Sequence, residues 1–581
     1  MNTCWASSLR LPVVLAATLL QTPASMSDQR DSKPSAAPKN IVELQTTRTI
    51  EADSLADGAG RHGTVTLANL NPAINSQFLL SLQLPDRPQA LNYHIENPAP
   101  ATQRLSLRNG APGHLSLDTG NKTVQCALWP DGSLEKARKS PHAFAPWCDG
   151  YLYLRNPVRG SQTVLEATTQ FLRDHVWFGE QIVGFVRSEF YQDAFMERAS
   201  TQTDAANRSR VPASHNGPPP ARMISSGVPR EIRASGLGID FGVSGPLVQG
   251  QWYAAAGLDG IDVSVVQPGA LSEGNVASTG RGRSLDSVES EALVYLVAFD
   301  LAEYEIGYAL GTEHPRLGWS ARTQEVARDT HLPGPDGIAN AAPLIRTGMV
   351  SPALQSRVVA TFTGGFKREH GAFRYGALAT VNHASHYGFV EQGVVFSRLN
   401  PGLSTLYVLN DGSVGMKTWT KADDRMLGQI RHARQNGVPL IERAPTGGGS
   451  IFGSLVDAWG PGNWSGSADE KLRTLRAGAC LIEHAGRQFL VYAYFSTATP
   501  RAMARVFYAY GCSYAMHLDM NALEHTYLAL YRPIGEHMHL EYLVGAMAVL
   551  DKSTGATVQP RFLGRADDRD FFYLMARKTK P

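Results

Sequence analysis

The chain has 581 residues, more than one hydrophobic core usually serves, and this length favours two or three domains. Its 54 lysines and arginines nearly balance 52 aspartates and glutamates, which gives a net charge of +2. No basic stripe is interleaved with aromatic residues, so nucleic acid is not expected as a partner.

The first residues have the pattern of a removable secretory signal peptide. Arg10 precedes the apolar run Leu11–Leu20, and the small residues 22–25 follow as a cleavage region. The run is too short to cross a bilayer, and no later segment has the pattern of a membrane span. A buried helix is the alternative, but the polar stretch 27–39 would leave it nothing to pack against. We therefore expect residues 1–25 to be removed and the protein to be exported, to a periplasm or to the extracellular space.

Alternating apolar and polar residues characterise the region 40–200. Leucines recur with a period of two within 80–84 and again within 105–107, and Gly, Pro and Asn separate such runs. This pattern predicts a β-rich, sandwich-like N-terminal module. A helical segment is expected near its end, where Thr163 and Glu166 have the spacing of a capping box.

The composition changes over Thr201–Arg230, where Ser, Thr, Asn, Arg and Pro replace the apolar pattern. We interpret 201–235 as a linker or a long exposed loop, and 236–581 as a second domain. Within that domain the first expected strand is Leu293–Phe299, which ends at Asp300.

Strand and helix patterns then alternate along the second domain. Residues 410–412, Asn-Asp-Gly between two apolar runs, predict a β-hairpin. Apolar spacing at 426–430 predicts a helix after it, which Gly437 would end. The nearly continuous apolar run Phe489–Phe495 predicts a strand that is buried on both faces.

A helix and a second strand are expected directly after that run. Thr499 can cap a helix that Gly511 ends, and the strand Tyr514–Leu518 follows with Asp519 at its end. A strand, helix and strand of these lengths predict a right-handed crossover, and hence an α+β or α/β fold class for the second domain. Ligands of α/β sheets collect at the carboxyl ends of parallel strands, which makes Asp519 a candidate for chemistry. A cap or turn carboxylate is the alternative.

Four cysteines remain after removal of the signal peptide, two in each half of the chain and none in a C-x-x-C pair. In an exported chain this favours two disulfides, Cys126 with Cys148 and Cys480 with Cys512. Four buried free thiols are the alternative.

Three motifs of the second domain follow one another in a recognisable order. They are the segment Ala360–Phe366, which ends in Thr-Gly-Gly-Phe, the pair Arg473–Thr474 before a strand, and the strand end His517–Asp519. With these motifs, roughly the region 288–578 resembles the phosphodiester glycosidase family, which is related to the lysosomal uncovering enzyme that removes N-acetylglucosamine from a phosphodiester. Thr363 stands where the family usually has Asn, and 520–522, Met-Asn-Ala, replace three glycines.

The resemblance implies a phosphodiester glycosidase-type domain with a site for an anionic substrate. Gly364 and Gly365 would let the backbone approach the ligand, and Arg473 or the nearby Arg476 would bind phosphate oxygens. A tight turn for the glycines and surface ion pairs for the arginines are the alternatives. The expected substrate-binding residues are Gly364, Gly365, Arg473, Thr474 and Asn521.

Cleavage of a glycosidic bond additionally needs a carboxyl group, for which Asp519 is the first choice and Glu524 the second. The expected function is that of an exported hydrolase acting on a sugar phosphodiester or a related glycosidic linkage of envelope or extracellular glycans. A non-catalytic glycan-binding protein and a structural envelope protein, each with a degenerate domain of this type, are the alternatives.

Other catalytic patterns are weak. The histidine pairs His383/His386 and His537/His539 lack an HExxH or similar pattern, so packed or solvated histidines are expected rather than a metal site. No serine lies in a G-x-S-x-G elbow, which disfavours an α/β-hydrolase. No cofactor is expected.

Overall fold

The computed structural model describes the chain from residue 37 to residue 578, except 57–59, 109–112, 130–131, 165, 169–192, 201–209, 225–229, 273–283, 322, 324, 372–385, 447, 457–472, 536 and 555–556. The predicted signal peptide, 1–25, and His383 lie outside the described residues. The predicted boundaries of the linker, 201–235, stay predictions.

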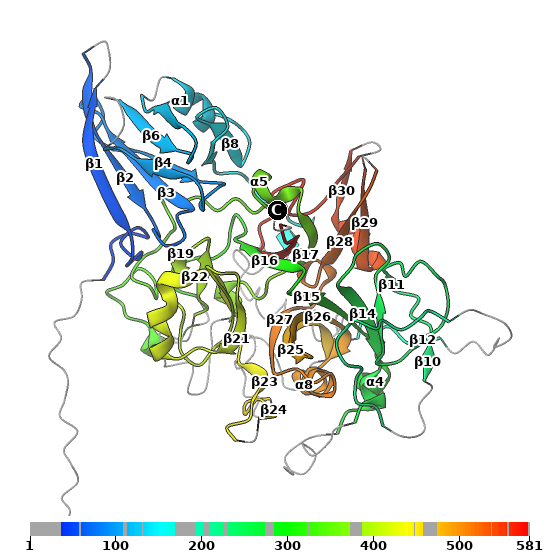
Figure 1. Ribbon diagram of the computed structural model, residues 1–581. Helices are drawn as coiled ribbons and strands as arrows, with labels where there is room; N and C mark the ends of the chain where they lie inside the picture. Colours follow the sequence, from blue (N-terminus) through cyan, green and yellow to red (C-terminus); the bar gives the residue numbers. More distant parts are fainter. Residues whose placement is uncertain are drawn as a thin grey trace, which may run out of the picture. The chain divides into compact units, whose positions relative to one another are not determined.

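The N-terminal region folds into two antiparallel sheets (Figure 1). The six-stranded sheet has the order β1 (Thr49–Ala56), β2 (His62–Asn69), β3 (Gln77–Gln83), β4 (Leu91–Glu96), β9 (Leu152–Arg155) and β8 (Phe144–Trp147). The three-stranded sheet contains β5 (Arg104–Ser106), β6 (His114–Asp118) and β7 (Thr123–Ala127), and a short helix, α1 (Ser133–Arg138), follows it. Alternate leucines of both sheets, among them Leu80, Leu82, Leu115 and Leu117, are buried in one hydrophobic cluster.

Both predicted disulfides are present. Cys126 of β7 is bonded to Cys148 just after β8, and so links the two N-terminal sheets. Cys480 is bonded to Cys512 in the C-terminal half of the chain. The alternative of four buried free thiols is therefore wrong.

The C-terminal half contains an eight-stranded antiparallel sheet, of which β15, β25, β26 and β27 are labelled in Figure 1. Its order is β13 (Trp252–Ala254), β14 (Ile261–Val266), β15 (Val294–Asp300), β26 (Arg487–Ala498), β25 (Thr474–His484), β27 (Tyr514–Met520), β23 (Pro439–Arg443) and β24 (Ser450–Phe452). The helix α8 (Pro500–Ala509) connects β26 to β27, and Thr499 caps it by accepting a hydrogen bond from the Ala502 N–H.

The predicted α+β or α/β fold class is wrong, because the protein is mainly β, with 41% strand and 12% helix in multiple antiparallel sheets. Strand β26, helix α8 and strand β27 do follow in the predicted order. However, β25 lies between the two strands and pairs antiparallel with both. The run Phe489–Phe495 is buried throughout, and such a run indicates only that both faces of a strand are covered. It does not establish parallel pairing.

A second C-terminal sheet is six-stranded and antiparallel. Its order is β11 (Leu237–Gly238), β29 (His537–Val544), β28 (Leu528–Ile534), β17 (Val358–Thr363), β32 (Phe571–Ala576) and β16 (Tyr304–Ala309). It packs against the eight-stranded sheet, since the rings of Phe362 in β17 and Tyr492 in β26 have centroids 5.1 Å apart. Both sheets contribute to one hydrophobic cluster.

A five-stranded antiparallel sheet has the order β19 (Val394–Ser397), β18 (Phe389–Glu391), β22 (Ile430–Gln435), β20 (Ser404–Leu409) and β21 (Val414–Thr418). Strands β20 and β21 form the hairpin predicted at 410–412, and Gly412 has the positive φ of 86° that favours glycine in this turn. The helix predicted from 426 to Gly437 is wrong. A 3₁₀ helix over Lys421–Gln429 leads directly into β22, whose central position in the sheet overrides the local spacing.

Shorter elements complete the described chain. They are α4 (Ser287–Glu291), α5 (Pro352–Gln355), α6 (Arg368–Gly371), the 3₁₀ helices Pro268–Ala270, Glu325–Ala327, Leu523–His525 and Gly545–Leu550, and the paired strands β10 (Glu231–Ile232) with β12 (Leu247–Val248) and β30 (Lys552–Thr554) with β31 (Thr557–Gln559). No helix in the described part of the chain has the length and hydropathy needed to cross a membrane.

The disulfides yield a prediction about stability. The variant Cys480→Ala/Cys512→Ala opens a loop whose ends are 32 residues apart, and its free energy of unfolding should fall by about 3.5 kcal/mol on the loop-entropy model. Equilibrium unfolding in urea at pH 7 measures this change. The matched variant Cys126→Ala/Cys148→Ala, with a separation of 22 residues, should lose a similar amount. A loss below about 1 kcal/mol in both variants would contradict the loop-entropy argument.

Candidate functional site

Four consecutive charged residues, Asp567 to Asp570, precede β32, and all four are buried, with exposed fractions between 1% and 4%. A buried charge is costly unless it is paired and hydrogen-bonded. Each of the four side chains contacts a different part of the chain. Asp567, for example, accepts hydrogen bonds from the Arg561 guanidinium at 2.7 and 3.0 Å.

Strand pairing brings this run beside the Thr-Gly-Gly-Phe motif. Strands β17 and β32 are antiparallel, with Thr363 opposite Phe571, so the residues after β17 lie next to the residues before β32. The Gly364 N–H donates to the Asp570 carbonyl at 2.9 Å. The Lys367 ammonium lies 3.0 Å from Asp568 Oδ2.

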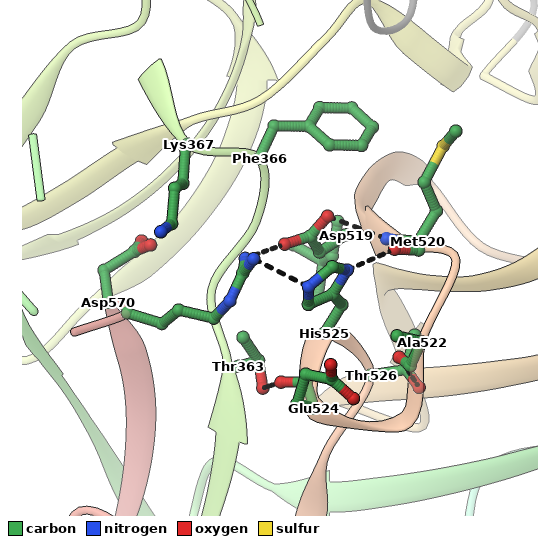
Figure 2. A network of polar contacts seen from close by, with 12 residues as sticks. Thr363, Phe366, Lys367, Asp519, Met520, Ala522, Glu524, His525, Thr526 and Asp570 are labelled. Atoms are coloured by element: carbon green, nitrogen blue, oxygen red, sulfur yellow. Dashed lines mark hydrogen bonds and ion pairs between the residues drawn. The ribbon is translucent and has the colours of Figure 1, made fainter. Parts of the chain in front are cut away.

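Arg569 joins this edge to the end of β27. Its Nη1 donates to Asp519 Oδ2 at 2.5 Å, and its Nη2 lies 2.7 Å from His525 Nε2; dashed lines in Figure 2 mark both contacts. The same Nη2 lies 2.7 Å from Glu166 Oε1. Asp519 Oδ1 additionally accepts the Met520 N–H at 2.8 Å. One guanidinium therefore holds a carboxylate from the predicted motif, a second carboxylate and an imidazole. We call Glu166, Lys367, Asp519, His525, Asp568 and Arg569 the Asp519 cluster.

The hydrogen bonds of His525 identify it as a neutral imidazole. Its Nδ1 lies 2.6 Å from the Met520 carbonyl oxygen, which can only accept, so Nδ1 carries the proton. Nε2 then accepts from Arg569. Burial and the neighbouring Arg569 lower the pKa of His525, in agreement with this assignment.

Two carboxyl groups of the Asp519 cluster differ in their titration. Lys367 Nζ lies 3.3 Å from Glu166 Oε1, so the same ammonium serves both Glu166 and Asp568. Although burial opposes ionisation, Arg569 and Lys367 hold the pKa of Glu166 well below its usual range. Burial, with the charges of Glu166 and Asp567, raises the pKa of Asp568 despite Lys367. Such a split is typical of acid and base pairs in active sites.

Two acceptor atoms of this pair have no hydrogen-bond partner among the described residues. They are Glu166 Oε2 and Asp568 Oδ1, both with almost no accessible surface. Buried acceptors are normally satisfied, and an exception indicates a functional role or a missing partner. The exposed fraction is 8% for Glu166 and 5% for Asp519, so the cluster lies just below the surface.

The predicted glycines make close contacts within the protein. A Cβ at Gly364 would collide with the Asp570 carboxylate, and a Cβ at Gly365 would lie 2.8 Å from Asn436 Oδ1. Only glycine therefore lets the β17 end approach Asp570 and the buried side chains of the five-stranded sheet.

The Arg-Thr motif is divided between two places. Thr474, the first residue of β25, donates from Oγ1 to Asn521 Oδ1 at 3.1 Å, and Asn521 directly follows β27. These two side chains therefore lie together. The Arg473 guanidinium instead lies 2.6 Å from Asp193 and 2.6 Å from Asp286, and no described contact joins it to Asp519. Asn521 has a φ of 82°, a conformation that Asn tolerates better than most residues.

The other predicted residues lie at the edges of the cluster. Arg476 of β25 is buried opposite Met520 of β27, its Nε donates to the Ala498 carbonyl at 2.8 Å, and burial lowers its pKa to about 9. Glu524 Oε1 accepts from the Thr163 hydroxyl at 3.1 Å, and its carbonyl accepts from Arg561 at 2.7 Å. Neither side chain contacts Asp519 directly in the described structure.

Sequence patterns missed five members of the Asp519 cluster. Glu166 was interpreted only as a capping residue; its N–H does bond to Thr163 Oγ1 at 3.1 Å, but its carboxylate contacts Arg569 and Lys367. The best available signal was the run 567–570, Asp-Asp-Arg-Asp directly before the apolar strand β32. Four charges at the start of a buried strand need partners, although such a run is usually an exposed turn.

Asp570 anchors a second buried network beside the cluster. Its Oδ2 accepts from Arg434 Nε at 2.8 Å and from the Tyr308 hydroxyl at 2.8 Å, and its Oδ1 lies 2.7 Å from His314 Nδ1. Burial alone would raise the pKa of Asp570, but Arg434 and His314 hold it well below its usual range. The carboxylate thus ties the six-stranded sheet to β22 of the five-stranded sheet.

Asp570 is predicted to make the fold acid-sensitive. Because its folded-state pKa lies below the unfolded value of about 3.9, its stabilisation is complete above that value and is lost as the pH falls further. Asp570→Asn should lower the free energy of unfolding by about 3 kcal/mol at pH 7, since it leaves Arg434 buried without its anion. Urea unfolding at pH 7, 5 and 3 should show a smaller loss on acidification in the variant than in the native protein. The exposed-site control Asp86→Asn should behave as the native protein does, and an equally acid-sensitive Asp570→Asn variant would refute the assignment.

Comparisons with known proteins give no family for this chain. No family model matches it, and no curated protein matches it. A solved structure of a presumed exported protein from Burkholderia pseudomallei aligns over 94% of this chain and 98% of its own, with 10% identity and a TM-score of 0.19. A likeness at that score carries no argument about fold or function.

Proposed function

We propose that the protein is an exported hydrolase that acts on a sugar phosphodiester or a related glycosidic linkage of envelope or extracellular glycans. In this proposal the Asp519 cluster is the active centre. The observation that carries the proposal is the contact of Arg569 with Asp519, Glu166 and His525, beside Lys367, which directly follows the Thr-Gly-Gly-Phe segment. Two motifs far apart in sequence thereby contribute to one charged cluster.

The charges of the cluster suit an anionic substrate. Lys367 and Arg569 are the cations, and a guanidinium binds the oxygens of a phosphate or carboxylate with fixed geometry. For the substrate to use these cations, its anionic group would replace part of their present contacts with Glu166 and Asp519. Only a charged group can replace the carboxylates that now contact Lys367 and Arg569, so the cluster should bind a multiply charged group in preference to a neutral sugar.

Two carboxyl groups of the cluster, Asp568 and Asp519, are candidates for complementary catalytic roles. Asp568, whose pKa is raised by burial, is the candidate general acid, which gives its proton to the leaving oxygen. Asp519, which accepts from Arg569 and from the Met520 N–H, is the candidate carboxylate, which activates water or attacks the anomeric carbon. Lys367 and Arg569 would stabilise charge on the departing phosphate.

Two further observations support export. The chain carries two disulfides, which form and persist in oxidising compartments and are rare in the cytosol. Its first residues have a signal-peptide pattern. We therefore propose a periplasmic or extracellular location.

A non-catalytic glycan-binding protein is the second candidate, and one observation favours it. Met520 stands where the family has a glycine, is 2% exposed, and places its sulfur 3.1 Å from Arg476 Nη1. A side chain thus occupies space that a glycine would leave open. A binding protein would keep the polar groups that recognise the glycan. It would lack the space that a substrate needs in order to be hydrolysed.

Substitution of the two carboxyl groups separates these candidates. Asp519→Asn and Asp568→Asn keep the shape but remove proton-transfer capacity, so turnover of a panel of sugar phosphodiesters and nitrophenyl glycosides should fall at least about 100-fold in each. Substrate affinity should change much less. The control Asp86→Asn should keep native kinetics. If the native protein binds a panel member without hydrolysing any, the enzyme proposal fails and the binding proposal stands.

A further inference from the structure

A cavity of about 340 Å³ lies at the opposite end of β32 from the Asp519 cluster. Its walls come from the loop after β4, from β16 and β32 of the six-stranded sheet, and from the β20–β21 turn and β22 of the five-stranded sheet. The volume lies within the range of small-molecule sites, and such sites often form where separate structural units meet. No member of the Asp519 cluster lines this cavity.

The units around the cavity are fixed to one another by buried polar contacts. Arg155 of β9 lies 2.6 Å from Glu391 of β18 and 3.8 Å from Glu96 of β4. The Ile345 N–H donates to His94 Nδ1 at 2.8 Å. The cavity therefore has a defined shape, because its walls are joined by short contacts to buried groups.

Cations exceed acids in the lining. The four cations are Arg357, Arg431, Arg577 and Lys578, and the three acids are Glu96, Glu305 and Asp411. Glu96 lies 3.8 Å from Arg155, which is outside the lining and is shared with Glu391. The lining thus carries an excess of one formal positive charge, from four cations and three acids.

The single acid Glu305 serves two of the four cations. It lies 3.0 Å from Arg357 Nη2 and 3.9 Å from Arg577 Nη1. Asp411 is used in its own turn, where Oδ1 accepts the Ser413 N–H at 2.8 Å. Neither acid is within ion-pair distance of the remaining cations in the described residues.

Arg431 and Lys578 are the cations that lack a carboxylate among the described residues. Arg431 Nη2 donates to Asn410 Oδ1 at a long 3.3 Å, and its buried Nε has no hydrogen-bond partner in the described structure. A buried guanidinium N–H without an acceptor is costly. The neighbouring His432 supplies no positive charge, since burial and Arg431 keep its pKa well below the usual range.

We infer that this cavity is a binding site for a small anionic ligand, whose phosphate or carboxylate group accepts hydrogen bonds from Arg431, Arg577 and Lys578. Such a group satisfies the Arg431 Nε donor and neutralises the excess charge. Residues 97–102 of the loop after β4 also line the cavity. The inference does not rest on the proposed function.

Calorimetric titration of the full-length protein at low salt tests the inference with three probes: inorganic phosphate, glucuronate and glucose. Phosphate, glucuronate or both should bind with a Kd in the millimolar range or tighter, and glucose should not bind. Binding of phosphate alone identifies a phosphorylated ligand, and binding of glucuronate alone identifies a carboxylate-bearing one. Binding of both identifies a site that recognises the negative charge the two probes share.

Variants locate the bound anion. Arg431→Gln and, separately, Lys578→Gln should weaken binding at least about fivefold. Lys578 makes no described ion pair, so Lys578→Gln should fold as the native protein does. It therefore tests the site even if Arg431→Gln fails to fold. The matched control Arg443→Gln, at an exposed arginine paired with Glu483, should bind as the native protein does. Absence of anion binding, or unchanged affinity in both cavity variants, overturns the inference.

Discussion

The burial of four consecutive charges, Asp567 to Asp570, is the constraint on which the C-terminal half depends. The backbone bends at Asp568 and Arg569, just before β32, and the side chains of the run reach different segments. One run therefore supplies anions and a cation to several segments at once. Asp567 and Asp570 are held by Arg561 and Arg434. Because unpaired charges at these positions would cost several kcal/mol each, the segments that carry their partners must assemble together.

This requirement links the sheets to the Asp519 cluster. Asp570 connects β32 to the five-stranded sheet, whereas the adjacent Arg569 connects it to the end of β27 in the eight-stranded sheet. The same rigidity that the pairing requires also orients Asp519, whose carboxylate is held on both oxygens. Side chains at strand ends whose hydrogen-bond partners are fixed can hold a ligand in a defined orientation. Both recognition and catalysis need such an orientation.

Sequence patterns predicted the features that depend on residues close together in the chain. The hairpin at 410–412 and both disulfides are present as expected, because a turn preference and the pairing of cysteines within one half of the chain can be inferred from neighbouring residues. The pairing partner of β26 could not be inferred, since burial of Phe489–Phe495 has the same appearance in parallel and antiparallel sheets. Arg569 was missed because its three partners come from segments that only the folded chain brings together.

The proposed function requires that the Asp519 cluster binds a ligand and does not serve only to hold the sheets together. A crystal structure of the protein soaked with a sugar phosphate tests it most directly. Ligand density is expected within hydrogen-bonding distance of Lys367 or Arg569, with Glu166 Oε2 accepting a hydrogen bond from the bound molecule or Asp568 Oδ1 hydrogen-bonded to it. The opposite result is a structure at saturating ligand in which Arg569 keeps its contacts with Asp519 and Glu166 and no ligand density lies at the cluster. That result would show that the buried charges are structural, and it would refute ligand binding at this site.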